Sequence, residues 1–144
     1  MTITESKLSD VYDYIINNRK NGKRTVFDIE YLQDWLEWAF EKKYLFVSTN
    51  KEQITGVLTV CPIGKWSEVP NIEQVIDSMG KSHTDTDYFI MDALTSSKEA
   101  RQELVNKALE RFKDIESNPN TQLYASVKDS IIKFNKQTIL TLKN

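Results

Sequence analysis

The chain has 144 residues, of which 40% are hydrophobic and 28% are charged, and its formal net charge is −2. This is the length of one globular domain (residues 1–144), and the composition is too apolar for a disordered chain. The small net charge gives no reason to expect a nucleic acid or an anionic membrane as partner. The chain has no apolar run near the roughly 20 residues of a membrane span, and residues 1–6 do not resemble a signal peptide. We therefore expect a cytoplasmic protein.

Two helices are predicted in the first third of the chain, after a short strand at residues 1–4. The first has an apolar stripe with helical spacing, formed by Leu8, Val11, Tyr12, Ile15 and Ile16. Arg19 and Lys20 followed by Gly22 are typical of a helix end. The second helix is expected to start at the capping residue Asp28. Its stripe contains Ile29, Leu32, Trp35, Leu36, Ala39 and Phe40.

Strand patterns follow. Residues 44–49 and 54–61 read as a hairpin with a polar loop of four residues, 50–53. Pro62 is expected to end the second strand, because proline has no amide hydrogen for the ladder. The segment 62–87 is about twenty residues longer than a tight connection requires, and it is predicted to contain a helix near 71–79.

The last third alternates between strands and helices. Residues 88–94 read as a buried strand, and a long helix is expected from Ser96 to about Phe112 or Ile115. A turn at 118–120 precedes a strand at 123–127, a short helix at 129–136 and a last strand at 138–142. These elements predict an α/β fold with a mixed central sheet flanked by helices.

The order of elements resembles the GNAT (acyl-CoA N-acyltransferase) fold over nearly the whole chain. Residues 46–58 match the family's second and third strands, where a glycine, here Gly56, follows a polar turn. Residues 88–112 match the family's strand that runs straight into a long helix. In the family this junction holds acetyl-CoA, so the resemblance implies acetyl-CoA as cofactor.

The resemblance implies a cofactor site at the start of this long helix, where free amides and a partial positive charge suit a pyrophosphate. The residues expected to bind are Ser96, Ser97, Lys98, Ala100 and Arg101. Leu104 and Val105 can be aligned with the paired leucines of the family's pattern Arg/Gln-x-x-Gly-x-Gly/Ala. Ser96 then stands at the Arg/Gln position, Glu99 at the first glycine and Arg101 at the second. Glu99 would repel a phosphate. The alternative is a capping box between Ser96 and Glu99, with Lys98 and Arg101 merely solvated.

For the chemistry, Asp92 at the end of the fourth strand is the candidate general base, and a structural carboxylate is the alternative. The family's general acid is a tyrosine, and its position falls on Asn135, which cannot donate a proton and become an anion. No metal site is expected. Cys61, in an apolar run, is expected to be a buried structural thiol.

Two functions remain open. The first is an N-acetyltransferase-related domain that transfers acetyl from acetyl-CoA to an amine, with reduced activity. The second is a catalytically inactive GNAT-fold protein that binds another protein, for example a phage accessory or virion-assembly protein, which would act in the host cytoplasm. A protein partner or a second copy would bind through 62–87, with Trp66 as exposed anchor. Four apolar residues of that segment are expected to pack on the sheet: Ile72, Val75, Ile76 and Met79.

Overall fold

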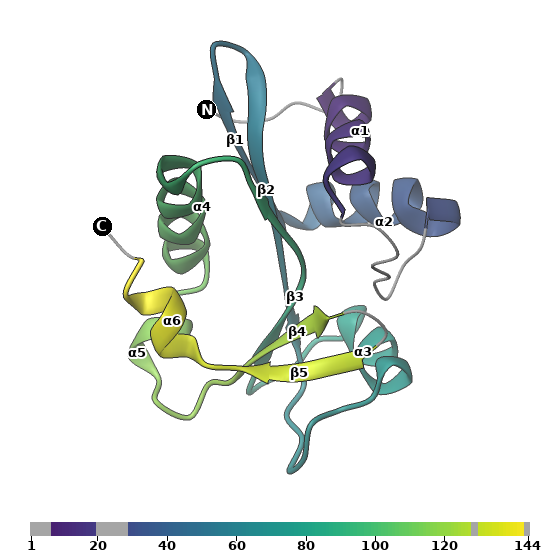
Figure 1. The fold of residues 1–144 in the computed structure, drawn as a ribbon. Helices are drawn as coiled ribbons and strands as arrows, with labels where there is room; N and C mark the ends of the chain where they lie inside the picture. The colour runs from purple at the N-terminus through teal and green to yellow at the C-terminus, as the bar shows by residue number, and fades with distance from the viewer. Residues whose placement is uncertain (1–6, 20–28, 128–129, 143–144) are drawn as a thin grey trace.

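The computed structural model describes residues 7–19, 29–127 and 130–142 (Figure 1). Within these ranges one five-stranded sheet has the order β1 (Leu45–Asn50), β2 (Gln53–Ile63), β3 (Asp87–Thr95), β4 (Leu123–Val127) and β5 (Ser130–Phe134). β3 and β4 are parallel, and the other neighbouring strands are antiparallel. The helices are α1 (Leu8–Asn18), α2 (Ile29–Lys42), α3 (Ile72–Met79), α4 (Lys98–Arg111), α5 (Asp114–Ser117) and α6 (Lys136–Leu140). The predicted α/β class, a mixed sheet flanked by helices, is confirmed.

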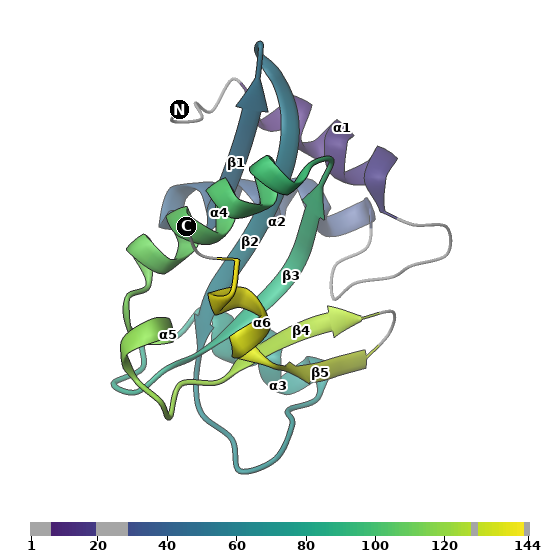
Figure 2. The same cartoon turned by 60° about the vertical axis from the view of Figure 1, so that its left-hand side comes forward.

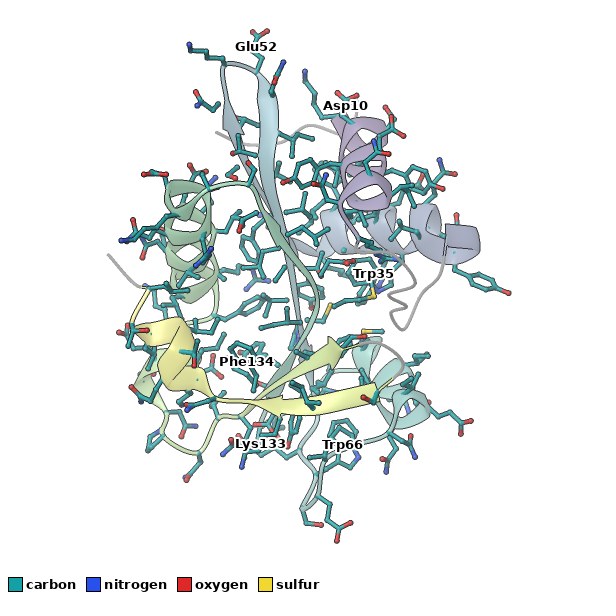
Figure 3. All side chains as sticks on the ribbon, viewed as in Figure 1. Asp10, Trp35, Glu52, Trp66, Lys133 and Phe134 are labelled. Carbon is teal, nitrogen blue, oxygen red and sulfur yellow. The ribbon has the colours of Figure 1, made fainter. Side chains whose placement is uncertain are left out.

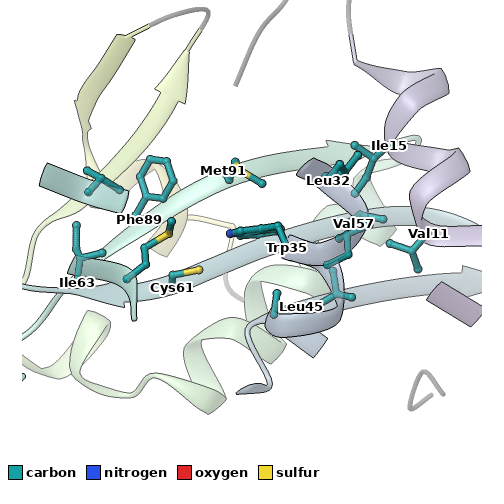
Figure 4. Close-up of a cluster of buried hydrophobic side chains, with 14 of the residues drawn as sticks. Val11, Ile15, Leu32, Trp35, Leu45, Val57, Cys61, Ile63, Phe89 and Met91 are labelled. Atoms are coloured by element: carbon teal, nitrogen blue, oxygen red, sulfur yellow. The ribbon is translucent and has the colours of Figure 1, made fainter. Parts of the chain in front are cut away.

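Helices cover both faces of the sheet and create two hydrophobic cores. On one face, here called the α1–α2 face, side chains of α1, α2 and α3 pack on the strands (Figure 4). Its fully buried residues include Val11, Ile15, Leu32, Val57, Cys61 and Phe89. On the opposite α4 face, side chains of α4, α5 and α6 pack on Leu58, Ile90 and Leu123. A buried residue can therefore be assigned to one face by the core in which it lies.

The helices predicted before the sheet and at 71–79 are confirmed. Val11 and Ile15 of α1 and Leu32 of α2 are fully buried, as their stripes predicted. α3 begins with a capping box, in which the Asn71 side chain accepts from the Gln74 amide at 2.8 Å and the Gln74 side chain accepts from the Asn71 amide at 2.9 Å. α1 ends at Asn18 with Arg19 as its C-cap residue, next to the predicted helix end. The strand at 1–4, the cap at Asp28, and Lys20 and Gly22 of that helix end lie outside the described ranges.

The hairpin differs from the prediction at both of its ends. The loop has two residues rather than four, because Asn50 pairs with Gln53 and only Lys51 and Glu52 turn, with φ of 52° and 67°. Pro62 does not end β2, which continues to Ile63. β1 pairs with β2 only as far as Thr59, so Pro62 faces no β1 partner and its missing amide hydrogen breaks no β1–β2 bond.

The C-terminal prediction was wrong in its last two elements. Residues 130–134 form the strand β5 rather than a helix, and residues 136–140 form the helix α6 rather than a strand. The adjacent β-branched residues Ile131 and Ile132 favour the strand, and pairing with β4, for example Ala125 with Ile132, completes it. Only residues 128 and 129 separate β4 from β5, which is too short a connection for the helix expected there.

Candidate functional site

At the centre of the sheet, β3 has a bulge, and β3 and β4 diverge from each other. Leu58 pairs with Ala93 and Val60 with Ile90, so Thr59 alone faces both Met91 and Asp92. The amide of Asp92 donates to the Thr59 hydroxyl at 3.0 Å. The parallel ladder between β3 and β4 ends in the same place, at Ile90 and Ala125. Beyond it β4 and β5 turn away from β3 (Figure 2), which leaves the facing edges of the two strands without a shared ladder.

An apolar cavity of about 390 Å³ lies on the α4 face, where the two strands diverge. Its walls come from the strands β2 to β5, the helices α4 to α6 and the residues just after α6. They include Leu58, Ile90, Leu104, Ala125, Ile139 and Leu142. Ala93 is an exposed small residue of β3 in this lining. Among the described residues, the polar ones in the lining are Thr95, Arg101, Ser126 and Thr138. The cavity can therefore accept a narrow and largely apolar molecule, with a cation beside it at the start of α4.

The start of α4 brings together the residues that sequence analysis assigned to a cofactor. Ser97, not Ser96, is the N-cap, and its hydroxyl accepts from the Ala100 amide at 3.1 Å. The predicted capping box of Ser96 and Glu99 is therefore wrong. Ser96 instead donates from its hydroxyl (3.0 Å) and its amide (2.9 Å) to the Thr55 carbonyl of β2.

Of these assigned residues, only Arg101 lines the cavity. Its side chain is exposed, as are those of Lys98 and Glu99. Ala100 is buried under the first turn with 4% exposure. Two cations and one carboxylate therefore surround this helix end, where the helix dipole adds a partial positive charge.

Asp92 lies apart from the cavity. Its carboxylate accepts two hydrogen bonds from the Arg19 guanidinium, from Nε at 3.1 Å and from Nη2 at 2.8 Å. The Asp92 side chain is 1% exposed and that of Arg19 is 9% exposed, so this is a buried bidentate ion pair at the end of α1. The bulge turns both Met91 and Asp92 to the α1–α2 face. A base at Asp92 would first have to leave Arg19.

No tyrosine, histidine or cysteine among the described residues lines the cavity. Asn135, at the position expected for the family's acid, caps α6 by accepting from the Gln137 amide at 3.0 Å. Burial and a 2.6 Å hydrogen bond to Asp114 raise the pKa of Tyr88. Burial also raises the pKa of the Cys61 thiol on the α1–α2 face. Proton transfer at the cavity therefore has no side chain among these residues to perform it.

The packing predicted for the segment between β2 and β3 is confirmed only in part, since Ile72 is half-buried rather than buried. Val75 and Met79 are buried, as expected, but Ile76 is 41% exposed and Val69 is 48% exposed. Trp66 is half-buried against the α1–α2 core rather than fully exposed. Sequence reasoning missed Ala93, Thr95 and Ser126 of the cavity. The sequence feature that could have indicated them is that these three side chains are small, in strands whose other residues are mostly large.

Two other classes of site, a membrane span and a metal centre, are absent from the described part of the chain. None of its helices is both long enough and apolar enough to cross a membrane. Among the same residues, no three His, Cys, Asp or Glu side chains are grouped so that they could hold a metal ion.

The chain has little similarity to known proteins. No protein-family model matches it, and no curated protein matches it in sequence. Among solved structures it is similar to a crystal structure described as histone acetyltransferase HPA2 and related acetyltransferase from Corynebacterium glutamicum. The TM-score is 0.41 at 16% identity, over 87% of this chain and 74% of that chain. This likeness is too slight to transfer the role of any residue.

Proposed function

We propose that this chain binds an acyl-CoA such as acetyl-CoA through the cavity on the α4 face, and that it transfers the acetyl group to an amine slowly or not at all. The observation that carries the proposal is the apolar cavity of about 390 Å³ between the diverging strands β3 and β4. A narrow molecule with peptide-like amide groups, as the pantetheine arm of CoA is, suits such a place. It can bury its apolar atoms while its amides pair with the strand edges that share no ladder.

The residues at the start of α4 suit only part of such a ligand. Arg101 lines the cavity and Lys98 is exposed one turn earlier, so both can pair with phosphate oxygens. Glu99 lies between them in sequence, and its carboxylate repels an anion at the same helix end. Thr95 and Ser126 can hydrogen-bond the amides of the arm. This combination supports binding, and it predicts weaker binding than a glycine-rich loop would give.

The chemistry follows from what lines the cavity. When bound, acetyl-CoA supplies an acetyl thioester that a neutral amine can attack. The chain contributes orientation and exclusion of water, which alone can accelerate the reaction of two reactants held together. It contributes no acid for the departing thiolate from its described residues, and Asp92 is held by Arg19 on the other face. We therefore expect binding to be much easier to detect than turnover.

The test is thermal unfolding of the whole chain with acetyl-CoA. At a concentration 100 times the Kd, binding stabilises the folded state by about 2.7 kcal/mol, or roughly 5–10 °C in Tm for this length. Ala93→Leu should obstruct the cavity and abolish the shift, because Ala93 is exposed in its lining. An unchanged Tm of the native chain at millimolar acetyl-CoA would reject the proposal. A shift that persists in Ala93→Leu would locate the ligand elsewhere.

Two charge variants test how the phosphates would be held. Arg101→Glu should weaken binding, whereas Lys113→Glu, an exposed change after the other end of α4, should not. Glu99→Gln removes the repelling charge and should tighten binding several-fold at low salt. The matched change Glu110→Gln near the C-terminal end of α4 should leave affinity unchanged. Equal effects of Glu99→Gln and Glu110→Gln would contradict the repulsion argument.

A further inference from the structure

A second pocket lies on the α1–α2 side of the sheet, at the start of β3 and β4. Its volume is about 510 Å³, and its lining includes Lys65, Trp66, Asp85, Asp87, Tyr124 and Lys133. Side chains alternate along β4, so Tyr124 faces away from Leu123 and Ala125, which line the apolar cavity. Lys133 of β5 pairs with Tyr124 and shares its face. Figure 3 shows Lys133 and Trp66 at this end of the molecule, beside β5.

Two deeply buried side chains of this pocket keep unused polar atoms. The Asp87 side chain is 2% exposed, and both of its hydrogen bonds end on Oδ1, from Lys65 Nζ at 2.7 Å and the Gln122 amide at 2.8 Å. Within the described ranges nothing donates to Asp87 Oδ2. Tyr124 is 3% exposed, and its hydroxyl has no hydrogen-bond partner in those ranges either. Neither atom is fully enclosed, so both can be reached from the pocket and can pair with a ligand there.

The charges of the lining favour a cation. The described residues of the lining include three carboxylates (Glu68, Asp85 and Asp87) and two ammonium groups (Lys65 and Lys133), with a net charge of −1. Lys65 is already engaged, because it also donates to the Asn120 carbonyl at 2.9 Å. Burial is the main cause that raises the pKa of Tyr124. The negative charge of Asp87 raises this pKa further, and the positive charge of Lys65 lowers it, so Tyr124 interacts electrostatically with both groups. Trp66 adds an aromatic wall, and indole rings attract cations.

We propose that this pocket binds a protonated primary amine, whose ammonium group donates to Asp87 Oδ2 and to the Tyr124 hydroxyl and packs beside the Trp66 ring. The amine belongs to a small molecule or to a lysine side chain. The pocket is on the other side of the sheet from the apolar cavity. The proposal therefore goes beyond acyl-CoA binding and stands or falls independently of it.

The experiment is a titration of the ¹⁵N-labelled chain with n-butylammonium chloride up to about 50 mM, followed by amide chemical shifts. We expect saturable shifts at the Gln122 amide and the Trp66 indole N–H, since carboxylate pairing and cation–π contact both act there. n-Butanol and butanoate, the neutral and anionic analogues, should give no saturable shifts. A lysine blocked at both backbone ends is the second amine, and tighter binding of one or the other tells whether a small amine or a lysine side chain fits better.

Three variants assign the contacts. Tyr124→Phe keeps the ring and should weaken butylammonium binding about 2- to 10-fold, the usual effect of one hydrogen bond. Tyr88→Phe is the matched control on the α4 face, where the hydroxyl bonds to Asp114, and it should leave the affinity unchanged. Asp87→Asn should weaken binding at least about tenfold. If Asp87→Asn fails to fold, the affinity of Tyr124→Phe for butylammonium still decides whether the amine binds in this pocket.

Four results would overturn the proposal. One is the absence of saturable shifts with either amine. Another is equal binding of butylammonium and butanol, because the charge would then not be recognised. The third is a native affinity in Tyr124→Phe. Preferential binding of butanoate would likewise reject a cation site.

Discussion

Around the bulge of β3, at the middle of the sheet, the two faces are packed in opposite ways. On the α1–α2 face, Val11, Leu32 and Phe89 are fully buried, and the one charged pair in the middle of β3, Arg19 with Asp92, is closed by two hydrogen bonds. On the α4 face a cavity of about 390 Å³ remains, and its lining keeps the small side chain of Ala93 exposed. The bulge at Met91 and Asp92 creates the difference. It turns the Asp92 carboxylate to the α1–α2 face, here called the closed face, at the point where the β3–β4 ladder ends.

This difference separates binding from acid–base chemistry. The cavity of the α4 face has no titratable side chain in its lining other than Arg101, among the described residues. At the centre of the sheet, Asp92 on the other face is held in an internal ion pair with Arg19. A residue type suited to catalysis is therefore no evidence of a catalytic site until its partners are known, and Asp92 illustrates the point.

The largest predicted effect concerns the closed face. Arg19→Leu leaves the Asp92 carboxylate buried without its partner, and such losses cost about 3–5 kcal/mol. The double variant Arg19→Leu/Asp92→Leu removes both charges and should recover most of that loss. Urea unfolding measures both free energies. A loss below about 1 kcal/mol in Arg19→Leu would show that the pair is not closed in solution.

The next prediction makes the same substitution on both faces. Ala39→Leu of α2 places a larger side chain where exposure is 0%, and overpacking should lower the free energy of unfolding by about 1–3 kcal/mol. Ala93→Leu enters the cavity and should change it by less than about 1 kcal/mol, with either sign. Thermal and urea unfolding compare the two. Equal losses would mean that the α4 face is as tightly packed as the other.

A smaller effect is expected in alkali, with one titrating group on each face. Burial raises the pKa of Cys61 and of Tyr88, so the folded chain keeps protons that the unfolded chain releases. Their stabilising contribution is complete below the unfolded pKa values, about 8.5 and 10, and falls as the pH rises above them. Cys61→Val should flatten the loss of stability from about pH 8.5, and Tyr88→Phe only from about pH 10, each by up to ~1.4 kcal/mol per pH unit. Unfolding in urea at several pH values provides the measurement, and identical onsets would contradict it.

The sequence predicted elements whose signal is local. The stripe containing Val11 and Ile15 and the Asn71 start of α3 specify helices, and both are observed. It mispredicted 129–142, because Ile131 and Ile132 fit a helical stripe as well as a strand until pairing with β4 decides. The cap at Ser97 rather than Ser96 was missed for a similar reason, since the Thr55 carbonyl that holds Ser96 is 41 residues away.

The candidate site could be predicted only in part. A helix start at Ser96 to Arg101 follows from sequence, and so does its lack of glycine. The cavity does not, because it depends on where the β3–β4 ladder ends and on the helix α6 at the C-terminal end. Nor does the pairing of Asp92 with Arg19, which joins residues 73 positions apart.

The most direct test of the central claim is chemical-shift mapping of the ¹⁵N-labelled chain with acetyl-CoA. If the cavity on the α4 face holds the ligand, the largest amide shifts should fall on its lining, at Ala93, Thr95 and Arg101, and they should disappear in Ala93→Leu. The amides around Arg19 and Val11 on the closed face should move little. Saturable shifts centred on Arg19 and Val11, or none anywhere at millimolar acetyl-CoA, would contradict the account.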